Sequence, residues 1–182
     1  MPAETDAEFA EYVGGRLPSL RRLAFLLCHD WHRADDLVQA SITKLYVHWH
    51  SARKAASLDA YVRTIIVREF LHERRSAWAR RVMLGSLLPD QPAAYLDADA
   101  AIDLRAAIAV LPTRQRAVLV LRYYCDLDVE QSAEVLGCSP GTVKSQTARA
   151  LASLRRQLTA MATTQQQLGA VIPADNAVEE AI

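Results

Sequence analysis

Residues 128–151 read DVEQSAEVLGCSPGTVKSQTARAL, and they carry the signals that begin and end two successive helices. Asp128 can cap the first helix, with a glutamine three residues later reaching back as in a capping box. Gly137 supplies the left-handed backbone conformation that ends this helix. Ser139 then caps the second helix, and Pro140 fills its first position. The stretch therefore predicts a short helix, a three-residue turn and a second helix.

The second helix of this pair has one apolar face and one polar face. Its buried stripe is expected to consist of Val143, Thr147, Ala150, Leu151 and Leu154. The side chains expected on or beside the opposite face are Thr142, Lys144, Ser145, Gln146 and Arg149. A polar second helix after a tight turn is how a helix-turn-helix enters the major groove, and the basic residues Arg155 and Arg156 further along favour phosphate contacts. We therefore predict that the segment binds duplex DNA and is not a plain helical hairpin with a solvated face.

The rest of the chain also predicts helices, so the expected fold class is all-α. Among its 182 residues 51% are apolar and only six are glycine, and apolar residues recur at helical steps with no alternating strand pattern. Basic residues exceed acidic ones in 1–81 and 104–160, whereas 82–103 and 161–182 carry acidic residues and no Lys or Arg. We expect two small helical domains, at 6–81 and 101–160, joined by an acidic linker at 82–100 and followed by a flexible tail at 161–182.

Composition also bears on where the protein works. Residues 1–12 are acidic where a signal peptide needs positive charge, and no stretch is long and apolar enough to span a bilayer. Three cysteines at wide spacing, Cys28, Cys125 and Cys138, argue against a secreted disulfide framework. We expect a cytoplasmic protein with reduced thiols and no membrane association.

The first domain shows a clear amphipathic helix that begins near Ala34 and leaves Asp36 and Gln39 on its polar face. Residues 9–28 predict one or two helices, with Pro18 near a break or in a first turn. A later helix begins near Leu58 and reaches an arginine-rich cluster at 72–81. In the second domain, a helix is expected from about residue 113 to 124.

Three short motifs resemble those of one protein family. Residues 111–118, LPTRQRAV, and residues 141–145, GTVKS, match the pattern around the helix-turn-helix in the sigma-4 domain of extracytoplasmic-function (ECF, group 4) sigma factors of the sigma-70 family. Residues 33–40, RADDLVQA, look like the sigma-2 helix that docks on the clamp of the polymerase β′ subunit. The motifs occur in the family's order, and the resemblance covers residues from about 6 to 160.

The resemblance implies a sigma factor, a subunit that binds core RNA polymerase and directs promoter-specific transcription initiation. Its sigma-4-like domain is expected to read the minus-35 element in duplex DNA, while its sigma-2-like domain opens and captures the minus-10 element. The implied partners are promoter DNA and the β′ clamp and β flap of polymerase, together with an anti-sigma factor, since family members are commonly held inactive by one. No catalytic activity and no cofactor are implied.

Each implied role falls on a set of residues in this chain. The minus-35 set is Thr142, Lys144, Ser145, Gln146 and Arg149. The minus-10 set combines aromatic and positively charged groups, which suit an opened strand whose bases have lost their stacking partners: Tyr61, Arg63, Arg68, Arg74, Arg75, Trp78, Arg80 and Arg81. The polymerase-docking set is Asp35, Asp36, Leu37 and Gln39.

Arg68 departs from the family pattern, because many members have an asparagine at about this position. A guanidinium donates hydrogen bonds but accepts none. Arg68 can therefore contact phosphate or stack on a base, but it cannot reproduce the two-sided pairing of an amide. The minus-10 preference is expected to differ from the family norm.

Two other kinds of site receive little support. Cys28, His29 and His32 are close in sequence, but the chain offers no second Cys/His cluster to complete a metal site. Asp35 and Asp36 are poor candidates for a catalytic pair, because helical neighbours point about 100° apart, and glycine-rich phosphate loops and nucleophile elbows are missing from the sequence. Neither a metal site nor an enzyme is predicted.

Two alternative functions remain open at this point. A two-domain helix-turn-helix regulator that acts without joining polymerase explains residues 104–160 but leaves residues 33–40 and the arginine cluster without a role. A helical interaction protein explains the amphipathic surfaces but not the fit of the second helix to a DNA groove.

Overall fold

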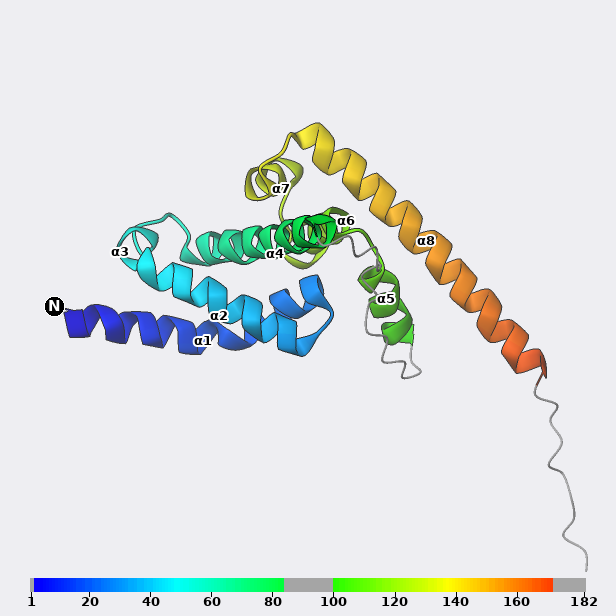
Figure 1. Ribbon diagram of the computed structural model, residues 1–182, viewed down its shortest axis with the longest axis horizontal. Helices are drawn as coiled ribbons and strands as arrows, with labels where there is room; N and C mark the ends of the chain where they lie inside the picture. Colours follow the sequence, from blue (N-terminus) through cyan, green and yellow to red (C-terminus); the bar gives the residue numbers. More distant parts are fainter. Residues whose placement is uncertain (1, 84–99, 172–182) are drawn as a thin grey trace, which may run out of the picture.

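The computed structural model describes the backbone of residues 2–83 and 100–171 and the side chains of residues 5–73 and 104–163. The first module comprises α1 (Pro2–Cys28), α2 (Trp31–Val47), α3 (Trp49–Ala52) and α4 (Leu58–Met83). The second module comprises α5 (Ala100–Ala109), α6 (Thr113–Leu119), the π-helical turn η1 (Val120–Tyr124), α7 (Val129–Leu136) and α8 (Pro140–Val171). Every regular element in these described ranges is helical, which confirms the all-α prediction (Figure 1).

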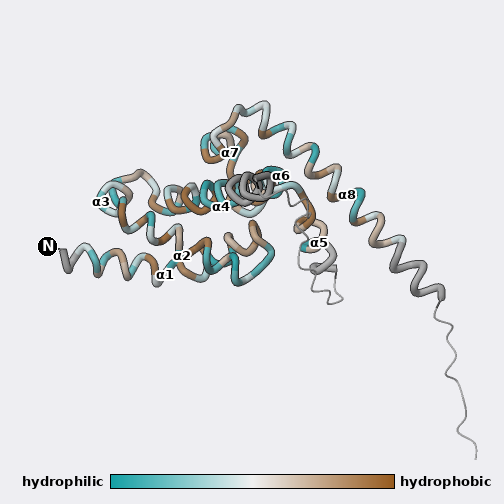
Figure 2. The backbone as a smooth tube through the Cα atoms, in the orientation of Figure 1, coloured by the Kyte–Doolittle hydropathy of each residue, from teal (hydrophilic) through white to brown (hydrophobic). Residues whose placement is uncertain are grey.

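Helices α1, α2 and α4 pack around a single apolar core in the first module (Figure 2). The periodicity of α2 correctly predicts its inward face, since Ala34, Leu37 and Leu45 are fully buried. Of the two alternatives for residues 9–28, the single helix is the one observed: α1 is continuous, and Pro18 lies inside it, at neither a break nor a first turn. Pro18 is exposed, and α1 carries it on its solvent side.

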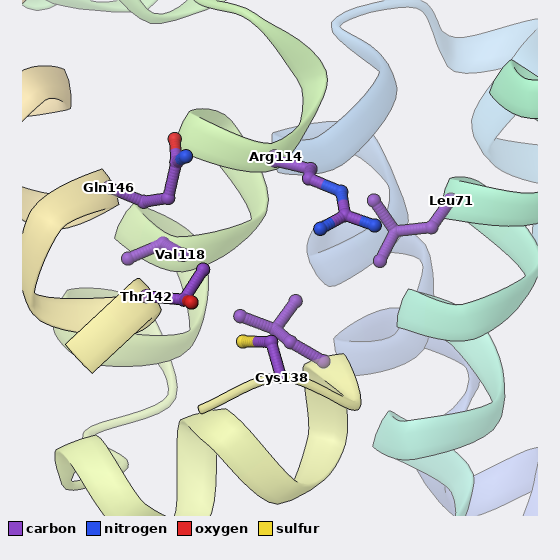
Figure 3. A pocket seen from close by; sticks show the side chains of 7 residues that line it. Leu71, Arg114, Val118, Cys138, Thr142 and Gln146 are labelled. Carbon is purple, nitrogen blue, oxygen red and sulfur yellow. The ribbon is translucent and has the colours of Figure 1, made fainter. Parts of the chain in front are cut away.

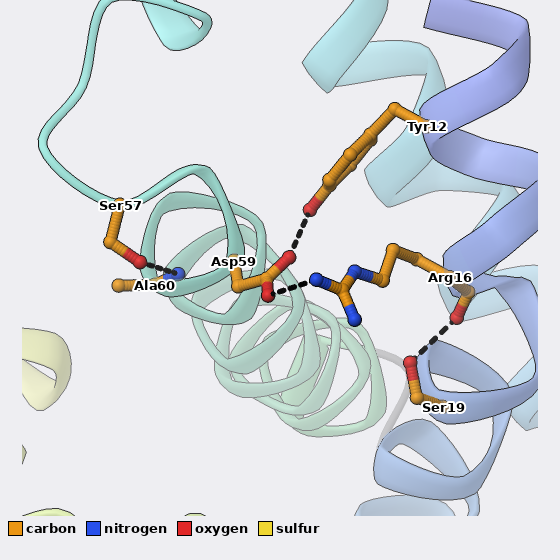
Figure 4. Close-up of polar contacts among 6 residues, drawn as sticks. All are labelled: Tyr12, Arg16, Ser19, Ser57, Asp59 and Ala60. Atoms are coloured by element: carbon orange, nitrogen blue, oxygen red, sulfur yellow. Dashed lines mark hydrogen bonds and ion pairs between the residues drawn. The ribbon is translucent and has the colours of Figure 1, made fainter.

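A polar cluster fixes α1 against the start of α4 (Figure 4). The Tyr12 hydroxyl donates to Asp59 Oδ1 at 2.8 Å, and Arg16 Nη2 lies 2.8 Å from Asp59 Oδ2. Burial and the bond to Asp59 raise the pKa of Tyr12 above its ordinary value, so its hydroxyl stays a donor. Ser57 Oγ accepts from the Ala60 amide at 3.2 Å and caps the same end of α4. The first turn of α4 is thereby fixed in place.

The predicted helix-turn-helix signals are all present between α7 and α8. The Asp128 carboxylate accepts from the Gln131 amide at 2.7 Å, and the Gln131 side chain accepts from the Asp128 amide at 3.0 Å. Gly137 adopts the left-handed conformation, with φ 61° and ψ 46°. Ser139 Oγ accepts from the Thr142 amide at 3.2 Å, which caps α8. Local capping therefore fixes where α7 begins and ends and where α8 begins.

The two modules share one continuous hydrophobic core, which the sequence does not predict. Ala117, Val120 and Leu121 from the second module pack in the same cluster as the buried residues of α1, α2 and α4. Arg116 lies at this contact and is only 4% exposed. Its guanidinium donates to the Leu27 carbonyl at the end of α1 at 2.7 Å, and to the carbonyls of Ala109 and Leu111 in its own module. These contacts hold the modules in a closed arrangement.

Helix α8 is longer than the sequence predicts. It continues to Val171, although a flexible tail is expected from residue 161. Residues 161–168 contain no Gly or Pro, and most of them, including Met161, Leu168 and three glutamines, are residue types that sustain a helix. In Figure 1 the C-terminal half of α8 extends away from the other helices.

His29 lies where α1 ends beside the second module. Its backbone is left-handed, with φ 56°, and its ring nitrogens are buried with no hydrogen-bond partner among the described residues. Burial, together with the positive charges of Arg116 and Arg105, lowers the pKa of His29 to about 4. His29 is therefore neutral in the folded protein at pH 7.

We expect the protein to lose stability as the pH falls from 7 to 5. The pKa of His29 is about 4 when folded and about 6.5 when unfolded, so the unfolded chain binds a proton first. The stabilisation is complete above about pH 6.5 and decreases on acidification, by at most about 2 kcal/mol at pH 5. Urea unfolding at both pH values should show this decrease. His29→Asn, which tolerates the left-handed backbone, should reduce it, and the exposed control His72→Asn should not. If the free energy of unfolding fell equally between pH 7 and pH 5 in the parent protein and both variants, His29 would not be the group responsible for the decrease.

We also expect Gly137→Ala to lower the free energy of unfolding by about 1 kcal/mol, because an L-residue is strained in the left-handed region. No atom lies within 4 Å of an added Cβ, so the loss comes from the backbone alone. Gly137→Asn should lose less. Gly15→Ala is a matched control, because Gly15 lies in α1 with open space around it and should gain stability. A gain at both glycines would contradict the αL assignment.

Candidate nucleic-acid interface

Three members of the predicted buried stripe of α8 and three members of the predicted outer set have the expected exposure. Val143 and Ala150 are fully buried and Leu154 nearly so. Val143 packs with Val118 and Ala133, while Ala150 packs against α5 and α6. Lys144, Ser145 and Arg149 are exposed, so they stand on the outer surface of the helix-turn-helix. The arrangement presents a hydroxyl and two positive charges together, which can donate to base edges and phosphates.

The other two members of the predicted minus-35 set are not fully exposed. Thr142 and Gln146 line a small pocket between the helix-turn-helix and α4. The remaining lining residues are Leu71, Arg114, Val118, Leu136 and Cys138. Figure 3 shows the Arg114 side chain extending from α6 toward Leu71 on α4. One edge of the reading face therefore lies against the first module.

Sequence reasoning assigns no role to Arg114 or Leu71, although both line the same pocket as Thr142 and Gln146. Arg114 belongs to the family-like stretch at 111–118, and its exposed charge beside the reading helix is a signal that the sequence does contain. Leu71 lies almost sixty residues before Asp128, where the helix-turn-helix begins. Only the packing of the two modules brings it there, so no local pattern identifies it.

Helix α4 carries the predicted minus-10 set. Tyr61 and Arg63 are half-buried and Arg68 is exposed. Tyr61 packs against the shared core, and Arg63 lies near enough to Cys125 of the second module to oppose the rise in thiol pKa that burial causes there. The side chains of Arg74, Arg75, Trp78, Arg80 and Arg81 lie outside the described residues.

Arg68 contacts the second module directly. Its Nε donates to the Val135 carbonyl and its Nη2 to the Glu134 carbonyl, each at 3.3 Å. Both acceptors lie in the last turn of α7, where carbonyls are free to accept from outside the helix; the Glu134 carbonyl also accepts from the Gly137 amide at 3.3 Å. Arg68 therefore ties α4 to the helix-turn-helix in this arrangement.

The predicted docking residues on α2 divide into three groups. Asp36 and Gln39 are exposed, and neither makes an ion pair in the described part of the chain. Asp35 is exposed but forms a two-bond ion pair with Arg21, at 2.6 and 2.9 Å, and this hydrogen bonding lowers the pKa of its carboxyl below the ordinary value. Leu37 is fully buried, so in this arrangement it offers no surface to a partner. Leu37 holds α2 on the core, and Asp36 and Gln39 remain available to a partner.

The described residues offer neither a metal site nor a membrane-spanning helix. Within the described residues, no group of three or more His, Cys, Asp or Glu side chains is placed to hold a metal ion. None of the described helices combines the length and apolar character needed to cross a membrane.

Two family models match this chain. Sigma-70 region 2 matches residues 13–80, which include α2 and most of α4, and Sigma-70 region 4 matches residues 101–154, which include the helix-turn-helix. The predicted docking set and the minus-10 set, except for Arg81, lie within the first match. The minus-35 set lies within the second match.

Curated relatives and a solved structure agree with these models. The chain is 37% identical over 160 residues to "RNA polymerase sigma-E factor" of Streptomyces coelicolor, covering 84% of this chain and 87% of that protein. It is 32% identical over 144 residues to "ECF RNA polymerase sigma factor EcfG" of Rhodopseudomonas palustris, covering 76% and 78%. Sigma factor RpoE of Bartonella quintana, solved in complex with the anti-sigma factor NepR, superposes with a TM-score of 0.67 at 28% identity, over 84% of this chain and 97% of that one. The chain therefore belongs to the extracytoplasmic-function sigma factors of the sigma-70 family.

Proposed function

We propose that this protein binds core RNA polymerase and directs initiation by reading the minus-35 element with α8 and the minus-10 element with α4. The observation that carries the proposal is the capped helix-turn-helix, whose second helix presents Lys144, Ser145 and Arg149 to solvent. The Sigma-70 region 4 match covers this segment. Exposed donors on a helix of this geometry suit the major groove.

The docking role falls on α2 in this proposal. Asp36 and Gln39 lie three residues apart on its exposed face, and the Sigma-70 region 2 match includes them. An exposed carboxylate beside an amide suits a basic partner surface, for which the β′ clamp is the candidate. The β flap is the candidate partner of the second module.

The proposal assigns the chemistry of transcription to the core enzyme and gives this chain recognition only. It places the protein in the cytoplasm, because core polymerase and promoter DNA are its partners. The relatives RpoE and NepR form a complex of sigma and anti-sigma factor, and this supports an anti-sigma factor as a further partner here.

Mixing the purified chain with core polymerase tests the proposal against its alternatives. A sigma factor co-elutes with core and starts transcripts at defined sites on genomic fragments. A regulator that works without joining polymerase shifts duplex DNA alone, and an interaction protein does neither. Failure to co-elute and to start transcripts would overturn the proposed function.

On a fragment selected by such run-off transcription, Lys144→Ala and Arg149→Ala should separate phosphate contact from base reading. Lys144→Ala should weaken binding across sequences and reduce the salt slope by about one. Arg149→Ala should cost about 1–3 kcal/mol and relax preference at one base position. Arg22→Ala, an exposed arginine on α1, is the control. Binding by both α8 variants that matches the control would remove α8 from the interface.

Asp36→Arg should sharply reduce co-elution with core polymerase, because it places a positive charge against a basic partner surface. Gln39→Ala should have a milder effect. Glu11→Arg, the same kind of charge reversal at an exposed site on α1, should co-elute normally. Helical content and thermal stability should stay nearly unchanged in all three variants. Normal assembly and transcription by Asp36→Arg would show that α2 does not dock on polymerase.

A further inference from the structure

The closed arrangement brings the candidate DNA-contacting residues of both modules to one interface. Arg68 donates to the Val135 and Glu134 carbonyls at the end of α7, at 3.3 Å each. Arg63 lies near Cys125 of the second module. From the other side, Thr142 and Gln146 share a pocket with Leu71, one turn beyond Arg68 on α4. Each module thus covers part of the surface that the other would offer to DNA.

The acceptors of Arg68 suit its charge. The last carbonyls of a helix carry the negative end of the helix dipole and can accept donors from outside the helix, and Glu134 accepts from Arg68 as well as from the Gly137 amide. Val135 itself is buried in the core that the two modules share. Arg68 therefore completes the C-terminal end of α7 from outside, next to apolar packing that excludes water.

Promoter geometry is incompatible with this contact. Elements centred near minus-35 and minus-10 are about 25 base pairs apart, or about 85 Å along the duplex at about 3.4 Å per step. In the closed arrangement α4 and the start of α8 line one pocket, so the two modules cannot reach both elements at once. The modules must separate before the proposed promoter contacts can form.

We infer that Arg68 is a closing contact of the free protein, and that α7 and the opened DNA strand compete for the same guanidinium. This inference rests on the proposed function for its DNA partner. Many family members have an asparagine at about position 68, and an asparagine side chain is shorter and carries no charge. Arg68 is a longer, charged donor, and it reaches the carbonyls of α7. The contact between α4, the proposed minus-10-reading helix, and α7 thereby reduces DNA binding by the free protein.

The thiol of Cys138 provides a readout of opening, because it lies half-buried in the turn between α7 and α8 and lines the pocket against α4. Alkylation by iodoacetamide, followed peptide by peptide with mass spectrometry, measures how often the pocket opens. We expect Arg68→Ala to speed the labelling of Cys138 by about fivefold or more, since two charged hydrogen bonds are lost. In Arg68→Lys the rate of Cys138 labelling should lie between the rates of the parent protein and Arg68→Ala. In Arg22→Ala the rate should equal that of the parent protein. Circular dichroism under the same conditions checks that the helices remain intact.

Duplex binding provides the second readout. When only the opened form binds, apparent affinity rises with the opened fraction, so Arg68→Ala should bind a 30-base-pair random-sequence duplex more tightly by the same factor as its labelling increases. Unchanged Cys138 labelling would show that Arg68 does not hold the modules closed. Faster labelling with unchanged duplex affinity would show that closure does not restrain DNA binding. Neither measurement uses polymerase, so their outcome is separate from the co-elution and transcription test of the proposed function.

Discussion

The buried guanidinium of Arg116 is the interaction on which the closed arrangement depends. A buried positive charge is costly unless hydrogen bonds compensate it, and Arg116 obtains them from the carbonyls of Leu27, Ala109 and Leu111. These acceptors belong to both modules, so one side chain sets the position of α6 against α1 and α5. The next two residues continue the arrangement, because Ala117 packs in the shared core and Val118 packs on Val143 of α8. The short helix α6 therefore orients the reading helix relative to the first module.

Features that depend on neighbouring residues could be predicted from the sequence. The capping box at Asp128, the left-handed Gly137 and the Ser139 cap each act within a few residues, so the residue types alone indicate the geometry. The buried and exposed faces of α2 and α8 follow from helical spacing in the same way. The amino-acid sequence alone is therefore sufficient to predict the helix-turn-helix and the all-α fold.

Features that depend on packing between distant segments could not be predicted. Arg116 and its acceptor Leu27 are 89 positions apart, and the acceptor is a backbone carbonyl that every residue possesses. The same holds for Arg68 and the end of α7, where the sequence suggested DNA contact alone. The docking motif contains both the exposed and the buried face of one helix, and Leu37 lies on the buried face. The family resemblance identifies a docking helix, and burial decides which of its residues a partner can touch.

Helix α8 has a mechanical consequence that follows from its length. Its 32 residues form a rod of about 48 Å at about 1.5 Å per residue. Because its first half is packed on α5, α6 and α7, the rod turns with the second module as one body. A rotation of that module by about ten degrees about the start of α8 moves the far end through about 8 Å. A small rotation of the second module when the Arg68 contact breaks would thus be amplified along α8. The resulting displacement would be large enough to disrupt the interface with any partner bound to the outer half of the helix.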